Sequence, residues 1–199
     1  AQSVPKSYYR SARASEAYDK AMGELCVSLA VTGQDAGEAL ETQPDLLYTQ
    51  ADLVVSACVT PSFSTYTLQA GPQAQGEMTV RFILKGDAQP DSVVDFTYAG
   101  GCMSVSDYLE SGPLPAQEAQ AELTQASALP WEEIQEAYLY FDLGERPRLE
   151  TDGQYVLFLT QTEEGYRLMD SQYAVLPVDA AGNLTDYTGR SWGTEESPT

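Results

Sequence analysis

Two apolar runs separated by a short turn are the clearest pattern along the chain. Residues 77–85 and 93–99 are each of strand length and rich in Val, Ile, Phe and Tyr. Residues 85–90 between them read Lys-Gly-Asp-Ala-Gln-Pro, and Gly, Asp and Pro favour turns. The pattern predicts a β-hairpin with a loop of about four to six residues.

Alternation assigns the faces of this hairpin, because successive side chains of a strand point to opposite sides. One face is expected to be covered and the other partly exposed to water. The side chains expected to share a face are Val80, Phe82 and Leu84 in the first arm and Val94, Phe96 and Tyr98 in the second.

Most other apolar runs are also of strand length and predict partners for the hairpin. They cover residues 53–60, 64–69, 102–106, 136–141, 154–160, 166–169 and 173–178. In the first of these, alternation places Leu53, Val55, Ala57 and Val59 on the buried face. Residues 71–76, which begin Gly-Pro and end in Gly, are predicted to form a loop.

Several stretches have the residue spacing or the starting residues that predict a helix. A three- and four-residue repeat runs from Ala14 to Leu29, although residues 26–31 could equally form a strand. Residues 44–51 begin with Pro and an acid, which favours a helix start. Residues 116–128 are rich in Ala, Gln and Glu, and 130–134 again begin with Pro, so both are predicted to be helical.

These elements predict a mainly β (α+β) protein. The expected architecture is an OB-like barrel of five to seven strands, or a twisted antiparallel sheet, with two to four short helices. We expect an N-terminal tether and helical appendage over residues 1–43, an OB-like β domain over 44–187 and a disordered acidic tail over 188–199. A helical insertion at about 111–136 interrupts the strands, and such excursions often carry binding loops.

The charge of the chain narrows its partners. Thirty acidic residues against ten basic ones give a net charge of -20. Such a field repels phosphate, so nucleic acid and anionic membrane surfaces are disfavoured. Cations and basic partners are favoured in principle, although a surface that keeps the chain in solution is the preferred explanation of the charge. No apolar segment reaches signal-peptide or membrane-spanning length.

The absence of histidine excludes whole classes of chemistry. The chain lacks the commonest general base and the usual zinc ligand, and it can form no Ser-His-Asp or Cys-His nucleophile. An acid-only mechanism, a Lys base or a Ser-Lys pair stays open. The three cysteines include no CxxC motif and do not form a disulfide framework. Cys58 and Cys102 are expected either to pair or, preferably, to remain buried free thiols.

Two groups of acids invite a metal or acid-base hypothesis. Glu132 and Glu136 would share a helix face next to Glu133, although acids at a helix start are more simply explained by the helix dipole. The other group has the composition of a calcium loop without the EF-hand spacing, and predicts a turn. It consists of Asp179, Asn183 and Asp186. We therefore assign no catalytic, metal or cofactor residue.

Three aromatic residues beside the insertion form the candidate ligand platform. Trp131, Tyr138 and Tyr140 could stack on a sugar or a peptide. Core packing of at least one of the two tyrosines is the alternative interpretation.

The order of the strands resembles a known group. A short helix, then ADLVVSACVT, VRFILKGD, a Gly-Gly strand and DGQYVLFLT resemble secreted or lipid-anchored bacterial proteins of unknown function. Their core is similar to the OB-type barrel of the tissue inhibitors of metalloproteinases. Those inhibitors chelate the target's metal through an N-terminal Cys-x-Cys edge, and Ala1-Gln2-Ser3 offers none, so inhibition is not implied.

The expected function is an extracytoplasmic binding module at the bacterial cell envelope, recognising a protein, peptide or glycan. The start at Ala1 fits either a removed leader, with a lipid anchor upstream as one form, or an artificial beginning. The alternatives are an Asp/Glu-dependent hydrolase or lyase, and a structural envelope subunit that pairs through an edge strand.

Overall fold

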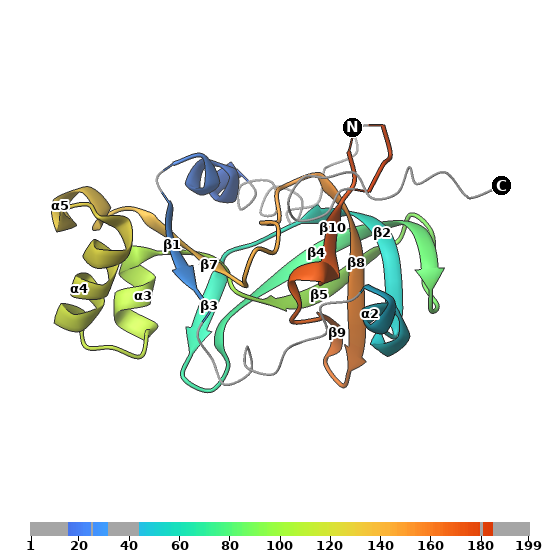
Figure 1. Ribbon diagram of the computed structural model, residues 1–199, viewed down its shortest axis with the longest axis horizontal. Coiled ribbons are helices and arrows are strands. Elements are labelled where there is room, and N and C mark those ends of the chain that lie inside the picture. The colour runs from blue at the N-terminus through green and yellow to red at the C-terminus, as the bar shows by residue number, and fades with distance from the viewer. Residues whose placement is uncertain (1–15, 25, 32–43, 180, 185–199) are drawn as a thin grey trace, which may run out of the picture.

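The computed structural model describes residues 16–24, 26–31, 44–179 and 181–184 (Figure 1). It is mainly β with helices, as predicted. Residues 1–15, 25 and 32–43 of the predicted N-terminal tether and appendage, and the predicted acidic tail over 188–199, lie outside the described residues. Among the described residues, no helix is both long and apolar enough to cross a membrane.

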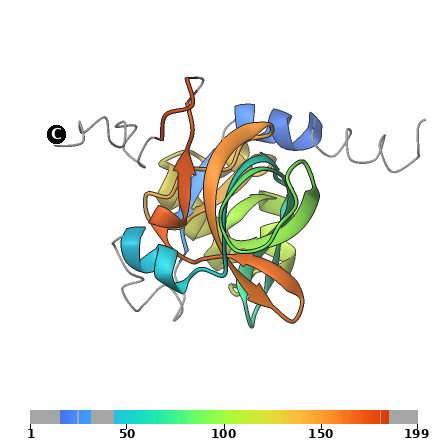
Figure 2. The same cartoon turned by 90° about the vertical axis from the view of Figure 1, so that its right-hand side faces the viewer.

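Five strands form a closed ring, which is the OB-like barrel that the sequence predicts (Figure 2). In ring order they are β8 (Gly153–Thr162), β2 (Leu53–Thr60), β4 (Gly71–Lys85), β5 (Val93–Ala99) and β9 (Gly165–Leu168). β9 pairs back onto β8 and closes the ring, and the β5–β9 pair is its single parallel pairing. Two short strands extend the sheet, β3 (Ser64–Thr67) on β4 and β10 (Val175–Pro177) on β8.

The barrel interior confirms the predicted faces in most places. Leu53, Val55, Ala57 and Val59 are all buried, and so are Phe96 and Tyr98 of the second hairpin arm. α2 (Pro44–Gln50) packs its Leu47 into the same core and matches the predicted helix over 44–51. Residues 173–178 start as a 3-10 turn (Gln172–Ala174) before they become β10.

The loop predicted over residues 71–76 is wrong, because this stretch is the first part of β4. It pairs with β3 on one side and β5 on the other. Pro72, Ala74 and Gly76 are buried and alternate with more accessible residues. Their small side chains hide the period of two, and the Gly and Pro residues suggest a turn instead.

The shared face of Val80, Phe82 and Leu84 is also wrong. Val80 is buried, whereas Phe82 is 72% exposed and Leu84 is 48% exposed. The register of β4 against β2 shifts twice in this region, and each shift inserts one extra residue. A β-bulge of this kind reverses the alternation, so Ile83 packs on the core instead of Phe82.

A second, three-stranded sheet lies beside the barrel. It has the order β1 (Cys26–Ala30), β7 (Tyr138–Asp142), β6 (Gly101–Ser104), with β1 parallel to β7. Residues 26–30 therefore form a strand, which resolves the ambiguity left by the sequence and joins part of the predicted appendage to this sheet. Residues 16–23 are helical.

Helices cover both faces of this second sheet (Figure 1). α3 (Val105–Ser111), α4 (Ala116–Ser127) and α5 (Trp131–Ile134) enclose one hydrophobic cluster with Leu139 and Phe141. On the other face Tyr18 of the helical segment packs with Tyr140. The strand predicted over 102–106 ends early, since the Ser104 hydroxyl accepts a hydrogen bond from the Asp107 amide and starts α3. The described residues thus hold five α-helical segments, more than the two to four predicted.

The bend at Gly100 and Gly101 carries the chain from the barrel into the second sheet. Both glycines have positive φ, 85° and 94°, which other residues seldom adopt. The Ser64 hydroxyl donates a 2.6 Å hydrogen bond to the Gly100 carbonyl, and a Cβ at Gly101 would clash with that hydroxyl. The bend predicted here is confirmed, and it fixes how the two sheets meet.

Candidate functional site

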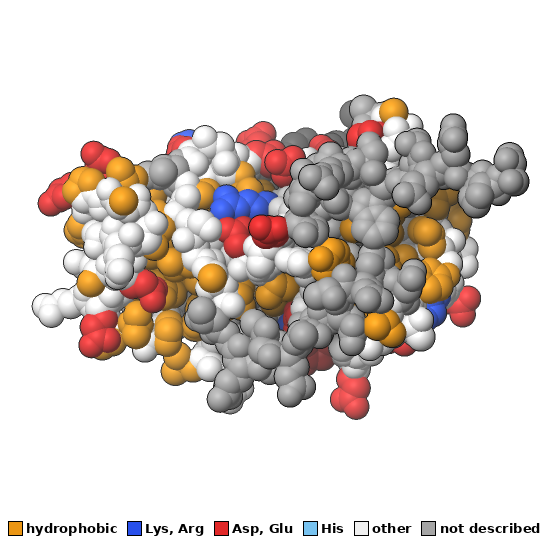
Figure 3. Space-filling view, viewed as in Figure 1, with side chains coloured by type: hydrophobic (Ala, Val, Ile, Leu, Met, Phe, Trp, Pro, Cys, Tyr) orange, Lys and Arg blue, Asp and Glu red, His pale blue; other side chains and the backbone are white. Residues whose placement is uncertain are grey.

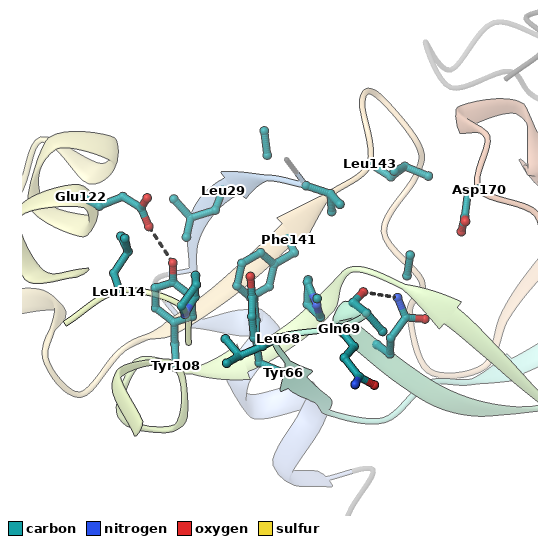
Figure 4. Close-up of a pocket in the computed structure, with 18 of the residues that line it drawn as sticks. Leu29, Tyr66, Leu68, Gln69, Tyr108, Leu114, Glu122, Phe141, Leu143 and Asp170 are labelled. Carbon is teal, nitrogen blue, oxygen red and sulfur yellow. Dashed lines mark hydrogen bonds between the residues drawn. The ribbon is translucent and has the colours of Figure 1, made fainter. Parts of the chain in front are cut away.

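A groove of about 800 Å³ lies where the barrel meets the second sheet (Figure 4). Its walls come from the β3–β4 turn and the end of β5 on one side, and from β1, β7 and helices α3 and α4 on the other. The turn at its rim presents Leu68, which is 77% exposed. On the face in Figure 3, hydrophobic side chains reach the surface between the helical end and the barrel.

Three aromatic rings from three different elements form the apolar end. Tyr66 comes from β3, Tyr108 from α3 and Phe141 from β7. Their ring centroids lie 5.6 to 6.1 Å apart in tilted or edge-on contacts. Tyr108 and Phe141 are buried and Tyr66 is half-buried, so the rings form a fixed apolar wall rather than an open stacking surface.

A carboxylate stands at the far side of this apolar end. The Tyr108 hydroxyl donates a 2.7 Å hydrogen bond to Glu122 Oε1. Burial, and then this hydrogen bond, raise the pKa of Tyr108, so the phenol remains a donor. Among the described residues Glu122 Oε2 has no hydrogen-bond partner, and it is available to a donor on a ligand.

The opposite end of the groove is polar. Arg167 Nη1 donates to Gln73 Oε1 at 2.6 Å, and Arg167 Nη2 lies 3.3 Å from Asp170 Oδ1. The Gln73 amide nitrogen donates in turn to the Ala70 carbonyl, which fixes its orientation. Figure 4 shows Glu122 and Asp170 at opposite ends of the groove.

Behind this polar end lies a second arginine. Arg146 is 9% exposed and donates from Nη2 to the Ala99 carbonyl at 2.8 Å and from Nη1 to the Met169 carbonyl at 3.4 Å. Burial lowers the pKa of Arg146, and the neighbouring Asp170 opposes that effect. Among the described residues, no carboxylate lies within ion-pair distance of it.

The predicted aromatic platform is divided between two faces of the second sheet. Trp131 packs on the cluster with Leu139 and Phe141, whereas Tyr138 and Tyr140 point to the other face. Tyr138 stacks on Phe63 at 5.8 Å. Tyr140 is 5% exposed, with the Arg148 guanidinium 4.4 Å from its ring centroid. The structure thus brings the two tyrosines together and leaves Trp131 apart, and none of the three lines the groove.

The structure does not bring either of the two predicted groups of acidic residues together as a site. Glu132, Glu133 and Glu136 are exposed, and α5 ends at Ile134, so Glu132 and Glu136 do not share a helix. Asp179 accepts backbone hydrogen bonds from Ala181 and Asn183, which confirms a turn there. Asp186 lies outside the described residues. In the part of the chain that the structure describes, no three His, Cys, Asp or Glu side chains are grouped to hold a metal.

The three cysteines are free thiols. Cys58 is half-buried and Cys102 is buried, so the preferred interpretation of unpaired thiols is confirmed. The neighbour of Cys102 is Cys26, and a hydrogen bond with Cys102 lowers the pKa of Cys26 to about 7.

The sequence located part of the groove without identifying it. The predicted insertion over 111–136 supplies Leu114 and Glu122 to the lining. Tyr66, Arg167 and Arg146 were not singled out, because each stands in a separate segment with no local motif. A polar residue in an apolar strand, as Arg167 is beside Leu168, was the available signal.

No protein-family profile, curated protein or solved structure matches this chain.

Proposed function

We propose that this chain is a non-enzymatic binding module and that its groove takes an extended peptide segment. The observation that carries the proposal is the groove itself, with an apolar aromatic wall at one end and amide and guanidinium groups at the other. Ligand sites are concave and mostly apolar, with a few polar groups that fix orientation. The volume of about 800 Å³ lies within the usual range for such sites.

The positions of the acids favour binding over catalysis. A hydrolase or lyase built on Asp and Glu needs two carboxyl groups facing one bond. Here Glu122 and Asp170 stand at opposite ends of the groove, bound to Tyr108 and Arg167 respectively. Neither end offers a second carboxylate to act as its partner among the groove-lining residues.

The aromatic wall favours a peptide over a glycan. Sugars stack on open ring faces, whereas Tyr66, Tyr108 and Phe141 pack against one another. Such a wall suits an apolar side chain. The amides of Gln69 and Gln73 line the same groove, and amides both donate to and accept from peptide backbone groups.

The location is part of the proposal. Action outside the cytoplasm at a bacterial envelope, secreted or lipid-anchored, is supported by the resemblance in strand order and by the acidic, tyrosine-rich composition. A structural envelope subunit is the alternative that would use an edge strand instead of the groove.

Selection of peptides tests the groove directly. The whole chain is immobilised and a random peptide library is selected on it, and dissociation constants of the selected peptides are then measured. We expect Leu68→Asp to weaken binding at least tenfold, since a charge replaces the exposed apolar residue at the rim. Phe82→Asp is the matched control, because Phe82 is similarly exposed but lies on the barrel strand β4, outside the groove lining.

Two results would refute the peptide groove. One is equal binding by wild type and Leu68→Asp, and the other is selection of no peptide while a glycan array gives a saturable signal.

A further inference from the structure

We propose that the polar end of the groove is a carboxylate-binding subsite, so that the ligand is a peptide that ends there. Its free C-terminus would lie at Arg167, and an apolar side chain near the C-terminus would lie against Tyr66 and Phe141. This inference rests on the proposed function and adds the chemistry and the direction of the ligand.

The local charge at this end is opposite to that of the molecule. The chain carries a net charge of -20, yet two guanidinium groups lie at this end, of which Arg167 pairs with Asp170 and Arg146 has no ion-pair partner among the described residues. Counted over the residues that the structure describes there, the polar end has one positive charge in excess. A ligand carboxylate would balance it, which gives the groove charge complementarity to an anion at this one point.

Arg167 has hydrogen-bonding capacity to spare. A guanidinium has five N–H groups in a planar fork, and this one directs Nη1 to Gln73 and Nη2 to Asp170. The side chain is one-third exposed at the groove wall. Its remaining N–H groups suit a carboxylate, the group that an arginine fork binds best.

Arg146 acts from behind the wall as a positioning residue. Its guanidinium bonds the carbonyls of Ala99 and Met169, and Ala99 lines the groove. Burying a cation without a carboxylate partner is costly, and a nearby anion recovers part of that cost. The field of Arg146 thus strengthens anion binding at Arg167 without contact to the ligand.

The apolar end of the groove determines the direction in which the peptide would bind. Glu122 faces the apolar end and would repel a carboxylate placed there. A peptide can therefore place its C-terminus only at Arg167. A lysine, an arginine or the free N-terminus of the peptide would be favoured near Glu122.

The experiment compares two matched peptide pools on the whole chain. Both contain the same random hexapeptides, N-acetylated, and they differ only in a free C-terminal carboxylate or a C-terminal amide. We expect the free acids to bind about tenfold more tightly than the amides, as charge-assisted hydrogen bonds would give. Raising the salt concentration should narrow the difference.

Substitutions show which residue causes the preference for a free C-terminal carboxylate. Arg167→Gln should reduce the preference for free acids to within about twofold, and Arg167→Lys should restore part of it. Arg81→Gln is the matched control, because Arg81 also pairs with an aspartate, Asp91 at 3.0 Å, but on the exposed barrel hairpin. The preference should be unchanged there. A circular dichroism spectrum and a thermal melt accompany each variant.

The outcomes separate this inference from the proposed function. Equal binding of acids and amides to wild type, with both lost in Leu68→Asp, overturns the carboxylate subsite and leaves the peptide groove standing. Binding of neither pool overturns both. If Arg167→Gln does not fold, the wild-type comparison decides, supported by loss of binding as the terminal carboxyl is protonated below about pH 3.5.

Discussion

The buried apolar side chains of the barrel form one cluster, whereas the second sheet divides its own between two faces. Of the described residues, 22 buried ones belong to the barrel cluster. The second sheet has ten on one face and four on the other. A closed ring covers its own core, but an open sheet needs helices on each side. The groove lies at the junction of the two regions, where neither core covers the surface completely.

The largest expected change in the free energy of unfolding comes from replacing one buried leucine in each region by alanine. Leu157 of β8 and Leu139 of β7 are both fully buried. We expect Leu157→Ala to lower the free energy of unfolding by about 4 kcal/mol and Leu139→Ala by about 2 to 3 kcal/mol, because helices packed on an open sheet can shift to fill a cavity and a closed ring cannot. Urea unfolding measures both. A larger loss for Leu139→Ala would contradict the contrast.

A smaller effect is expected where the two regions join. Gly101→Ala places a Cβ against the Ser64 hydroxyl at positive φ, and we expect it to cost about 1 to 3 kcal/mol. Gly165→Ala is the control, since Gly165 also has positive φ, 119°, but nothing within 4 Å of the added atom. The difference between the two melts isolates the contact with Ser64. Equal costs would show that the bend is held by backbone conformation alone.

The smallest expected change in stability at neutral pH comes from the buried tyrosines, whose contribution depends on pH. Burial raises the pKa of Tyr140 in the second sheet from 10.0 to about 12, and burial also raises the pKa of Tyr98 in the barrel. A raised folded-state pKa stabilises the protein fully below pH 10, and this contribution is lost as pH rises from 10 towards 12. Stability should therefore fall over this window.

Tyrosine-to-phenylalanine variants show how much each region contributes to the loss of stability at alkaline pH. Tyr140→Phe should cost about 1 kcal/mol at pH 7 for the lost hydrogen bond and make the alkaline fall shallower. Tyr98→Phe should do the same in the barrel. Urea unfolding at pH 7, 9, 10 and 11 measures the slopes. An unchanged slope in both variants would assign the alkaline fall to other groups.

The barrel was largely predictable because its strands alternate visibly. β2 and β5 showed the period of two with large side chains, and Gly100-Gly101 signalled the bend. The first part of β4 was missed because Pro72, Ala74 and Gly76 carry little hydrophobic signal. The exposure of Phe82 depends on bulges that arise from pairing with β2, which a single strand does not encode.

The groove was harder to predict because it depends on pairing between distant segments. Trp131, Tyr138 and Tyr140 are neighbours in sequence, and the sheet separates Trp131 from the tyrosines by its two faces. Tyr66 and Phe141 are far apart in sequence and meet at 6.1 Å. Local patterns therefore indicated the insertion as a wall and gave no signal for the opposite one.

The pairing of β1 with β7 also determines when the second sheet can be completed. Ser28 of β1 donates a hydrogen bond to Asp142 of β7, 114 residues later. At about 5 to 20 residues per second, a ribosome needs roughly 6 to 23 seconds to make the partner after the first strand. Until then β1 lacks the strand it pairs with, and contacts between such distant segments form slowly. β1 therefore stays without this partner until β7 has been made, and the wall of the groove that β1 supplies cannot form before then.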